Sequence, residues 1–119
     1  MLIDNKINLY NPGVKESDCV ITLKTKNNIG YSLSFGDIGM TLEWPEGTDR
    51  TLRLDSKNNL VIDANTGEIL NEYVTEGDFF KIPLGEPILN VEEFRADTTE
   101  NNEKAQNNEV TIDYNYYYY

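Results

Sequence analysis

The chain has 119 residues, which is the size of one domain with a single hydrophobic core. Ten Lys and Arg residues stand against 21 Asp and Glu residues, and the net charge of −11 repels nucleic-acid phosphates and anionic lipid surfaces. The composition also excludes His-dependent catalytic triads and imidazole metal sites, because there is no histidine, and one cysteine is too few for a thiolate zinc site or an internal disulfide.

The amino-terminal stretch MLIDNKINLYN lacks both a basic start and an apolar segment of signal-peptide length. Apolar runs elsewhere are also far too short for a membrane span. We therefore expect neither secretion by a signal peptide nor insertion into a membrane. The abrupt start is also expected of a chain that is one domain of a longer protein.

Period-two alternation of apolar and polar residues recurs along the chain, without any convincing helical period. The first four predicted strands fall in INLYNPG, DCVITLKT, IGYSLSF and GMTLEW, and turns rich in Asn, Gly and Pro separate them. The alternation predicts one buried and one wet face on each strand. The expected core residues are Cys19, Ile21, Leu23 and Thr25, then Ile29, Tyr31, Leu33 and Phe35, then Met40, Leu42 and Trp44. Cys19 is thereby expected to be a buried, inert thiol.

The next stretch, TLRLDSKNNLVIDANTGEILNEYV, predicts a three-stranded meander with turns at 56–59 and 64–67. Its strands carry Leu52 and Leu54, then Leu60 and Ile62, then Ile69 and its neighbours. Residues 63–68 also resemble the opening of a calcium loop, but their glycine falls one position early for the EF-hand pattern. A hairpin turn is therefore the favoured interpretation.

A short strand is expected at 79–82 and ends at Pro83, because proline cannot donate to a sheet ladder. Phe79 and Phe80 are adjacent, so a strand sends their rings to opposite faces and leaves one of them more exposed. Another strand is expected before residues 95–109. That segment, RADTTENNEKAQNNE, contains no large hydrophobe and is expected to form a mobile polar loop.

The chain closes with VTIDYNYYYY, which predicts a final strand. Its alternation places Tyr114 and Tyr116 in the core and Tyr117 and Tyr119 on the surface. About nine or ten short strands without repeats favour an all-β fold with two packed antiparallel sheets. We therefore expect residues 1–119 to form one β-sandwich domain, with a closed barrel as the alternative.

Trp44 has two candidate roles in the sequence, as part of a sugar-binding surface or as a core residue. With Glu43 and Glu46 it would form a sugar-binding platform, but its register with the apolar residues of its strand favours the core. Carboxylate pairs of the kind that hydrolyse glycosidic bonds arise by chance among 21 acidic residues, so we assign no catalytic, cofactor-binding or metal-binding residues. Exposed aromatic rings are candidates for protein contacts. The candidate partner surface consists of Trp44, Phe79, Tyr117 and Tyr119.

Four segments follow one another in a particular order: LYNPG, LRLDSKNNLVID, TGEILNEYVTEGDFFKIPLGE and VTIDYNYYYY. This order resembles the C-terminal domain of siphophage distal tail proteins, the Dit family. The matching positions are Asn11 and Gly13, residues 54–63, Phe80, Pro83, Gly85 and Glu86, and residues 114–119. The resemblance covers nearly the whole chain except 95–109, which looks like an insertion of the sort that varies between phages. The family's final strand often carries arginines among its tyrosines, whereas this one has none.

The resemblance implies a galectin-like or jelly-roll type sandwich at the periphery of the hub where a phage tail tube meets the host-adsorption apparatus. It implies a structural, non-enzymatic domain of the virion tail tip, encoded by a phage or prophage and made in the host cytoplasm. Its implied partners are other phage tail proteins, with no nucleic acid and no membrane.

In the family, a separate N-terminal domain builds a hexameric ring. The resemblance therefore implies that the isolated domain is a monomer and that the full-length parent is a hexamer. A galactose site of the galectins combines His, Asn, Arg and Trp, and this chain has no His, so no carbohydrate site is carried over. A carbohydrate-binding module for host cell-wall glycans is the alternative function.

Overall fold

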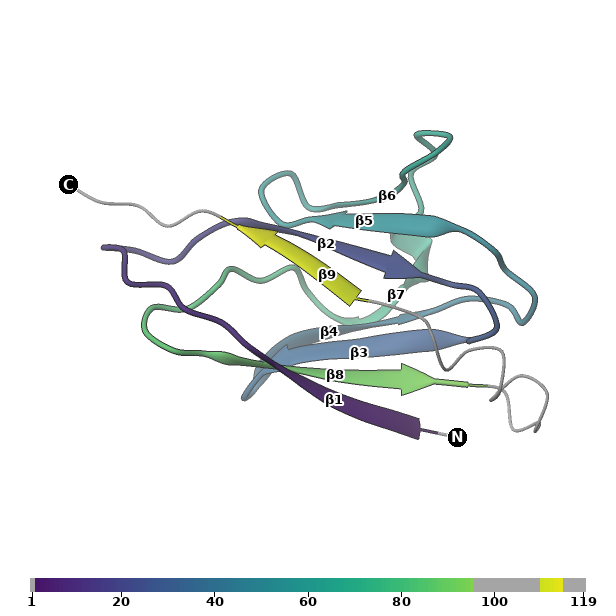
Figure 1. The fold of residues 1–119 in the computed structure, drawn as a ribbon. Helices are drawn as coiled ribbons and strands as arrows, with labels where there is room; N and C mark the ends of the chain where they lie inside the picture. Colours follow the sequence, from purple (N-terminus) through teal and green to yellow (C-terminus); the bar gives the residue numbers. More distant parts are fainter. Residues whose placement is uncertain (1, 96–109, 115–119) are drawn as a thin grey trace.

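Nine strands form in residues 2–95 and 110–114, the part of the chain that this computed structural model describes. They build two antiparallel sheets stacked as a β-sandwich (Figure 1), which confirms the fold class expected from the sequence. The five-stranded sheet has the order β1 (Leu2–Asn8), β8 (Ile88–Phe94), β3 (Gly30–Phe35), β4 (Ile38–Glu43) and β7 (Val74–Gly77). The four-stranded sheet has the order β6 (Leu60–Asp63), β5 (Thr51–Asp55), β2 (Cys19–Lys24) and β9 (Val110–Tyr114). A 3-10 helix, η1 (Asn71–Tyr73), precedes β7.

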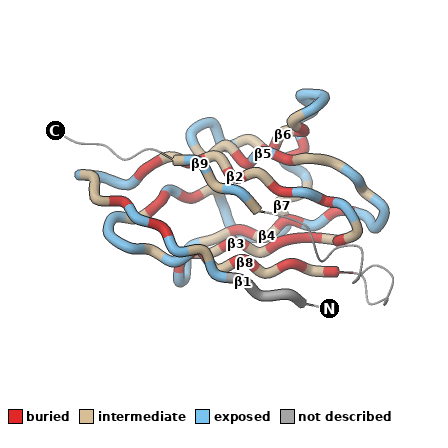
Figure 2. Tube along the Cα trace, in the orientation of Figure 1, coloured by how far each residue is buried: buried red, intermediate tan, exposed pale blue. Residues whose placement is uncertain are grey.

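The core lies between the two sheets and is formed by every second residue of their strands (Figure 2). Five leucines at its centre, Leu23, Leu33, Leu42, Leu52 and Leu89, are fully buried. The inward faces expected for β2, β3 and β4 are confirmed, with Ile29 half-buried just before β3 begins. Cys19 is buried as expected, and Trp44 continues the core face of β4 beyond the end of that strand.

The predicted three-stranded meander is wrong in its third strand. Ile69 is 57% exposed and makes one isolated bridge to Ile62, after which the chain turns into η1. Residues 68–70 pair with β6 only through two backbone hydrogen bonds, from the Asp63 N–H to the Glu68 carbonyl at 2.9 Å and from the Leu70 N–H to the Val61 carbonyl at 2.7 Å, and a side chain then satisfies the next donor of β6. Asn71 Oδ1 accepts a hydrogen bond from the Val61 N–H at 2.7 Å, and Asn71 Nδ2 donates to the Asn59 carbonyl at 3.0 Å. With the edge of β6 satisfied in this way, the chain crosses to β4 and forms β7 in the other sheet.

The inward face of β6 is set by its pairing with β5. Val61 lies opposite Leu54 and Asp63 lies opposite Leu52, and both β6 residues are buried. Leu60 and Ile62, the hydrophobes that the alternation picks out, are only half-buried. A charged residue therefore occupies a core-facing position at the end of β6.

The strand expected at 79–82 is not formed. Gly77 ends β7 with a φ of +75°, in the left-handed region that glycine tolerates, and the chain then runs as a connection with one bridge between Ser17 and Ile82. The two phenylalanines nevertheless differ as expected, because Phe80 is buried and Phe79 is half-buried.

The final strand is confirmed for the residues that the structure describes. Ile112 and Tyr114 are half-buried on the inward side of β9, whereas Thr111 and Asp113 between them are exposed. The expected positions of Tyr116, Tyr117 and Tyr119, and of the polar loop after Arg95, lie outside the described residues. Arg95 itself is buried.

Candidate functional site

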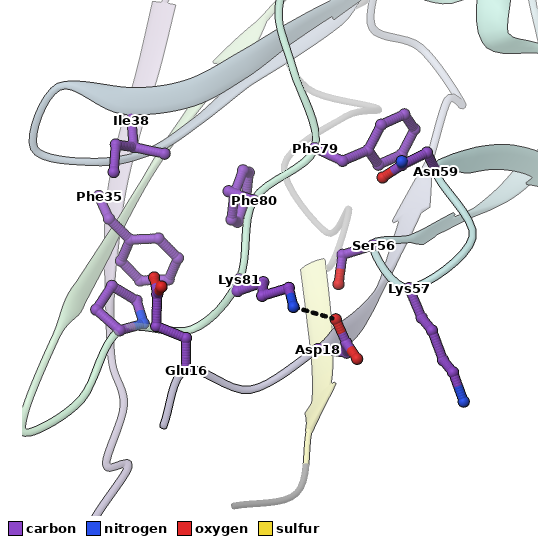
Figure 3. Close-up of a pocket in the computed structure, with 11 residues that line it drawn as sticks. Glu16, Asp18, Phe35, Ile38, Ser56, Lys57, Asn59, Phe79, Phe80 and Lys81 are labelled. Carbon is purple, nitrogen blue, oxygen red and sulfur yellow. Dashed lines mark ion pairs between the residues drawn. The ribbon is translucent and has the colours of Figure 1, made fainter. Parts of the chain in front are cut away.

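A cleft of about 570 Å³ opens at the end of the sandwich where β3 turns into β4 and β5 turns into β6 (Figure 3). The segment before β2 and the connection after β7 complete its walls. Its lining residues are Glu16, Asp18, Phe35, Ile38, Ser56, Lys57, Asn59, Phe79, Phe80, Lys81 and Pro83. We refer to this feature as the end cleft.

The apolar part of the end cleft is fixed by a pair of buried rings. Phe35 and Phe80 meet edge to face, with ring centroids 5.3 Å apart and planes at 83°. This geometry is favoured because the positive edge of one ring meets the negative face of the other. Ile38 is 57% exposed at the β3–β4 turn, and Phe79 is half-buried. The end cleft thus presents apolar surface that rests on the buried pair of Phe35 and Phe80.

Charged groups of both signs surround this apolar surface. Lys81 Nζ lies 3.6 Å from Asp18 Oδ1, and the lysine side chain is more than half exposed, so this ion pair adds little to stability. Glu16 and Lys57 contribute one further charge of each sign to the lining. Ser56 is held in place because its Oγ accepts a hydrogen bond from the Cys19 N–H at 2.8 Å.

Cys19 is not a nucleophile for the end cleft. Its thiol is buried, and burial raises the pKa of this thiol above its ordinary value, which keeps it protonated. The Cys19 thiol also lies within hydrogen-bonding distance of the Phe80 carbonyl, at 3.9 Å. Cys19 is therefore a structural residue, in agreement with the expectation from its strand.

Three of the segments that carried the family resemblance meet beside the end cleft. Asn11 and Gly85 pair through two backbone hydrogen bonds of 2.7 and 2.8 Å, and Asn11 Nδ2 donates to the Ile82 carbonyl at 3.1 Å. The Tyr114 hydroxyl donates to the Tyr10 carbonyl and accepts from the Tyr10 N–H, both at 3.0 Å. Asn11 is completely buried although it is polar, and its hydrogen bonds account for this. The turn at 11–13, the segment at 82–86 and the end of β9 thus form one interlocked unit.

The structure excludes Trp44 from the candidate partner surface. Its side chain is 5% exposed, and its indole N–H is shared between the carbonyl and the side-chain oxygen of Asn28, at 3.0 and 3.1 Å. Trp44 is therefore a core residue, because the inward register of β4 extends to it. Phe79 lines the end cleft, and Tyr117 and Tyr119 lie outside the described residues.

A second cleft, of about 540 Å³, lies at the opposite end of the four-stranded sheet beside the 64–67 turn. We call it the arginine cleft. Its lining residues are Pro45, Thr48, Asp49, Arg50, Asp63, Thr66 and Tyr73. The Arg50 Nη1 atom donates to Asp63 Oδ2 at 2.9 Å and to Glu68 Oε2 at 2.8 Å. Sequence reasoning missed this group, because it depends on the register of the β5–β6 hairpin, in which Asp63 lies opposite Leu52, and on the turn that follows β6.

The residues 63–68 form the turn that the sequence favoured over a calcium loop. Gly67 has a φ of +78°, and its N–H donates to the Asp63 carbonyl at 2.8 Å. Asp63 Oδ1 accepts hydrogen bonds from the N–H groups of Asn65 and Thr66, at 2.8 and 3.1 Å. These backbone donors, with Arg50 as a further donor, lower the pKa of Asp63 below its ordinary value.

The lowered pKa of Asp63 predicts a loss of stability in acid. Because the pKa is lower in the folded state, the contribution of Asp63 is present above the pKa of the unfolded chain, ~3.9, and is lost as the pH falls through the folded value. The free energy of unfolding of the Asp63→Asn variant should therefore lie below that of the parent near neutral pH and approach it in acid. Urea unfolding of both proteins across this range measures the gap, and a gap that does not change with pH would contradict the prediction.

A buried polar network occupies the same end of the sandwich and joins β3 to β8. Glu93 Oε2 accepts hydrogen bonds from Asn28 Nδ2 at 2.7 Å and from the Tyr31 hydroxyl at 3.0 Å. Glu93 Oε1 faces Arg95, with its Nε at 2.7 Å and its Nη2 at 2.6 Å. Burial, and then the charge of Glu93, raise the pKa of Tyr31 above its ordinary value, so the phenol stays protonated and acts as a donor. The network satisfies a buried carboxylate on both oxygens.

Comparisons of the chain with protein-family models, with curated protein sequences and with solved structures found no match. Across residues 2–95 and 110–114, no helix has the length and apolar character needed to cross a membrane. Within the same residues, His, Cys, Asp and Glu side chains form no group of three or more that could hold a metal ion. The assignment of a function therefore depends on the fold, the two clefts and the family resemblance.

Proposed function

We propose that this chain is a structural, non-enzymatic domain of a siphophage distal tail protein, which presents a surface to neighbouring tail or receptor-binding proteins at the virion tail tip. The observation that carries the proposal is the interlocked unit of Asn11, Gly85 and Tyr114. These residues come from three of the four segments whose order resembles the Dit family, and they are far apart in the chain. Asn11 contacts Gly85 directly, and Tyr114 contacts Tyr10, the neighbour of Asn11 in the same segment, so the three matched segments support one another.

The end cleft is the surface that we propose for the protein contact. It combines the exposed Ile38 and the half-buried Phe79 with charged groups of both signs. Interfaces between proteins that also exist apart have this character, with apolar anchors inside a polar rim. The net charge of −11 favours a partner with a basic surface, since opposite charges steer encounter. In this proposal the isolated domain is monomeric and its full-length parent forms the ring.

The proposal is tested by cryo-electron microscopy of the parent particle and by co-purification with the products of neighbouring genes. We expect one copy of this sandwich for each subunit of the ring at the tail tip. The variant Ile38→Ser should bind the neighbouring tail protein more weakly, whereas Ile69→Ser is a matched control, because both isoleucines are 57% exposed and only Ile38 lines the end cleft. A particle without this domain at its tail tip would overturn the assignment to a tail protein. Equal effects of the two variants would show that the end cleft is not the contact surface.

A further inference from the structure

Arg50 presents part of its guanidinium group to the arginine cleft. Its Nη1 atom is held by Asp63 and Glu68, and its N–H backbone group donates to Thr25 Oγ1 at 2.7 Å. The Nε and Nη2 atoms make no hydrogen bond to any side chain or backbone group in the described part of the chain. Two carboxylates thus fix the plane of the group while some of its donors stay open to a ligand.

Acceptors and an apolar face surround these donors. The Asp49 carboxylate lines the cleft, and Glu68, which lies beside the lining, holds Arg50 through Oε2. The ring of Tyr73 is half-buried in the cleft wall. Behind it lies Trp44, with ring centroids 6.0 Å apart and planes at 53°, so the Tyr73 ring rests on the core. The arginine cleft therefore places fixed donors, open acceptors and a supported aromatic ring in one concave surface.

We propose that the arginine cleft is a binding site for a neutral saccharide. Sugar hydroxyl groups both donate and accept hydrogen bonds, so they need donors such as the guanidinium and acceptors such as carboxylates side by side. The C–H face of a sugar ring packs on an aromatic ring. Arg50, Asp49 and Tyr73 supply these three elements, with Asp63 and Glu68 positioning the arginine.

The charge balance of the cleft sets the class of saccharide. One arginine stands against the carboxylates of Asp49 and Asp63 in the lining and of Glu68 beside it, and the whole chain carries a net charge of −11. Phosphorylated or acidic sugars would be repelled by this surplus. A bare cation would meet the guanidinium between the carboxylates, which opposes its binding. A neutral sugar carries no such penalty, so it is the ligand that these groups fit.

This site goes beyond the structural role proposed above and does not depend on it. It also differs from the sugar platform that the sequence suggested around Trp44. That platform required the Trp44 ring to be exposed, whereas the structure buries it and leaves the neighbouring Tyr73 ring half-buried in the cleft wall. Trp44 is here a support for the ring that would contact the sugar.

Titration of the full chain with lactose, cellobiose and chitobiose, followed by ¹H–¹⁵N NMR spectroscopy, tests this inference. We expect saturable shifts of the Asp49, Thr66 and Tyr73 amides with at least one of these probes and a millimolar dissociation constant. Arg50→Lys should weaken that binding by about tenfold, because lysine lacks the planar donors. The matched control is Arg53→Lys, which changes an exposed arginine on β5 outside both clefts.

A second variant keeps the test decisive if Arg50→Lys does not fold. Glu68→Gln removes one charge from a side chain that is half exposed and leaves the contact between Arg50 and Asp63 in place, so its spectrum should stay that of the parent while its affinity falls several-fold. The inference is overturned if none of the three disaccharides produces saturable shifts at these amides. It is equally overturned if Arg53→Lys weakens binding as much as Arg50→Lys and Glu68→Gln do.

Discussion

Replacing Glu93 by Ala should lower the free energy of unfolding by about 3–5 kcal/mol, because the substitution removes the carboxylate that contacts Nε and Nη2 of the buried Arg95 guanidinium. The Asn28 amide and the Tyr31 hydroxyl would each lose an acceptor in the same buried space. Urea unfolding, followed by circular dichroism, measures the change. Glu92→Ala is the matched control, since this neighbouring glutamate is half-buried and points to the other face of β8.

A double variant distinguishes two contributions to the free energy of unfolding: the cost of removing one member of the Glu93–Arg95 pair, and the net stabilisation that the intact pair provides. Replacing Glu93 and Arg95 together by leucine removes both charges of the buried ion pair at once. The double variant should therefore be more stable than the sum of the two single losses predicts. The prediction is contradicted if Glu93→Ala costs no more than Glu92→Ala.

Trp44→Ala should destabilise the fold by about 3–5 kcal/mol, the range for removing a large buried ring. The ring packs between Tyr31 and Tyr73, with centroid distances of 5.8 and 6.0 Å, so a cavity would open beneath both. Trp44→Phe is the control, because it keeps most of the ring and loses the indole hydrogen bonds to Asn28, for a cost of roughly 1–2 kcal/mol. Thermal unfolding of the three proteins measures this order of stability, and an unchanged melting temperature for Trp44→Ala would contradict the core position.

The alternation of side chains was a reliable guide wherever a strand has one buried face. It identified the inward residues of β2, β3 and β4, because each of these strands is paired along its whole length and has one face against the opposite sheet. It failed at Ile69, where the decisive contact is the Asn71 side chain on the edge of β6. A side chain that replaces a backbone partner leaves no periodic signal in the sequence.

The clefts were harder to predict than the fold. Phe79 was found because adjacent aromatic residues in an extended chain cannot both be buried on one face. The group formed by Arg50, Asp63 and Glu68 depends on the register of the β5–β6 hairpin and on the turn after β6, and the alternation of side chains does not fix that register. A signal did exist for the buried network: Glu93 continues the apolar face of Leu89 and Val91, and a charged residue at such a position requires a buried partner.

The hydrogen bonds between Tyr114 and Tyr10 have a mechanical consequence. The strand β1, which begins at Leu2, starts at one end of the sandwich, and β9, which ends at Tyr114, finishes at the other (Figure 1). Tension applied between these two residues would therefore act along the strands and strain all the rungs of the β1–β8 and β2–β9 ladders at once, instead of unzipping them one by one. The two hydrogen bonds between the Tyr114 hydroxyl and Tyr10 add a further link at the end of β9, so we expect the domain to resist a pull along this direction.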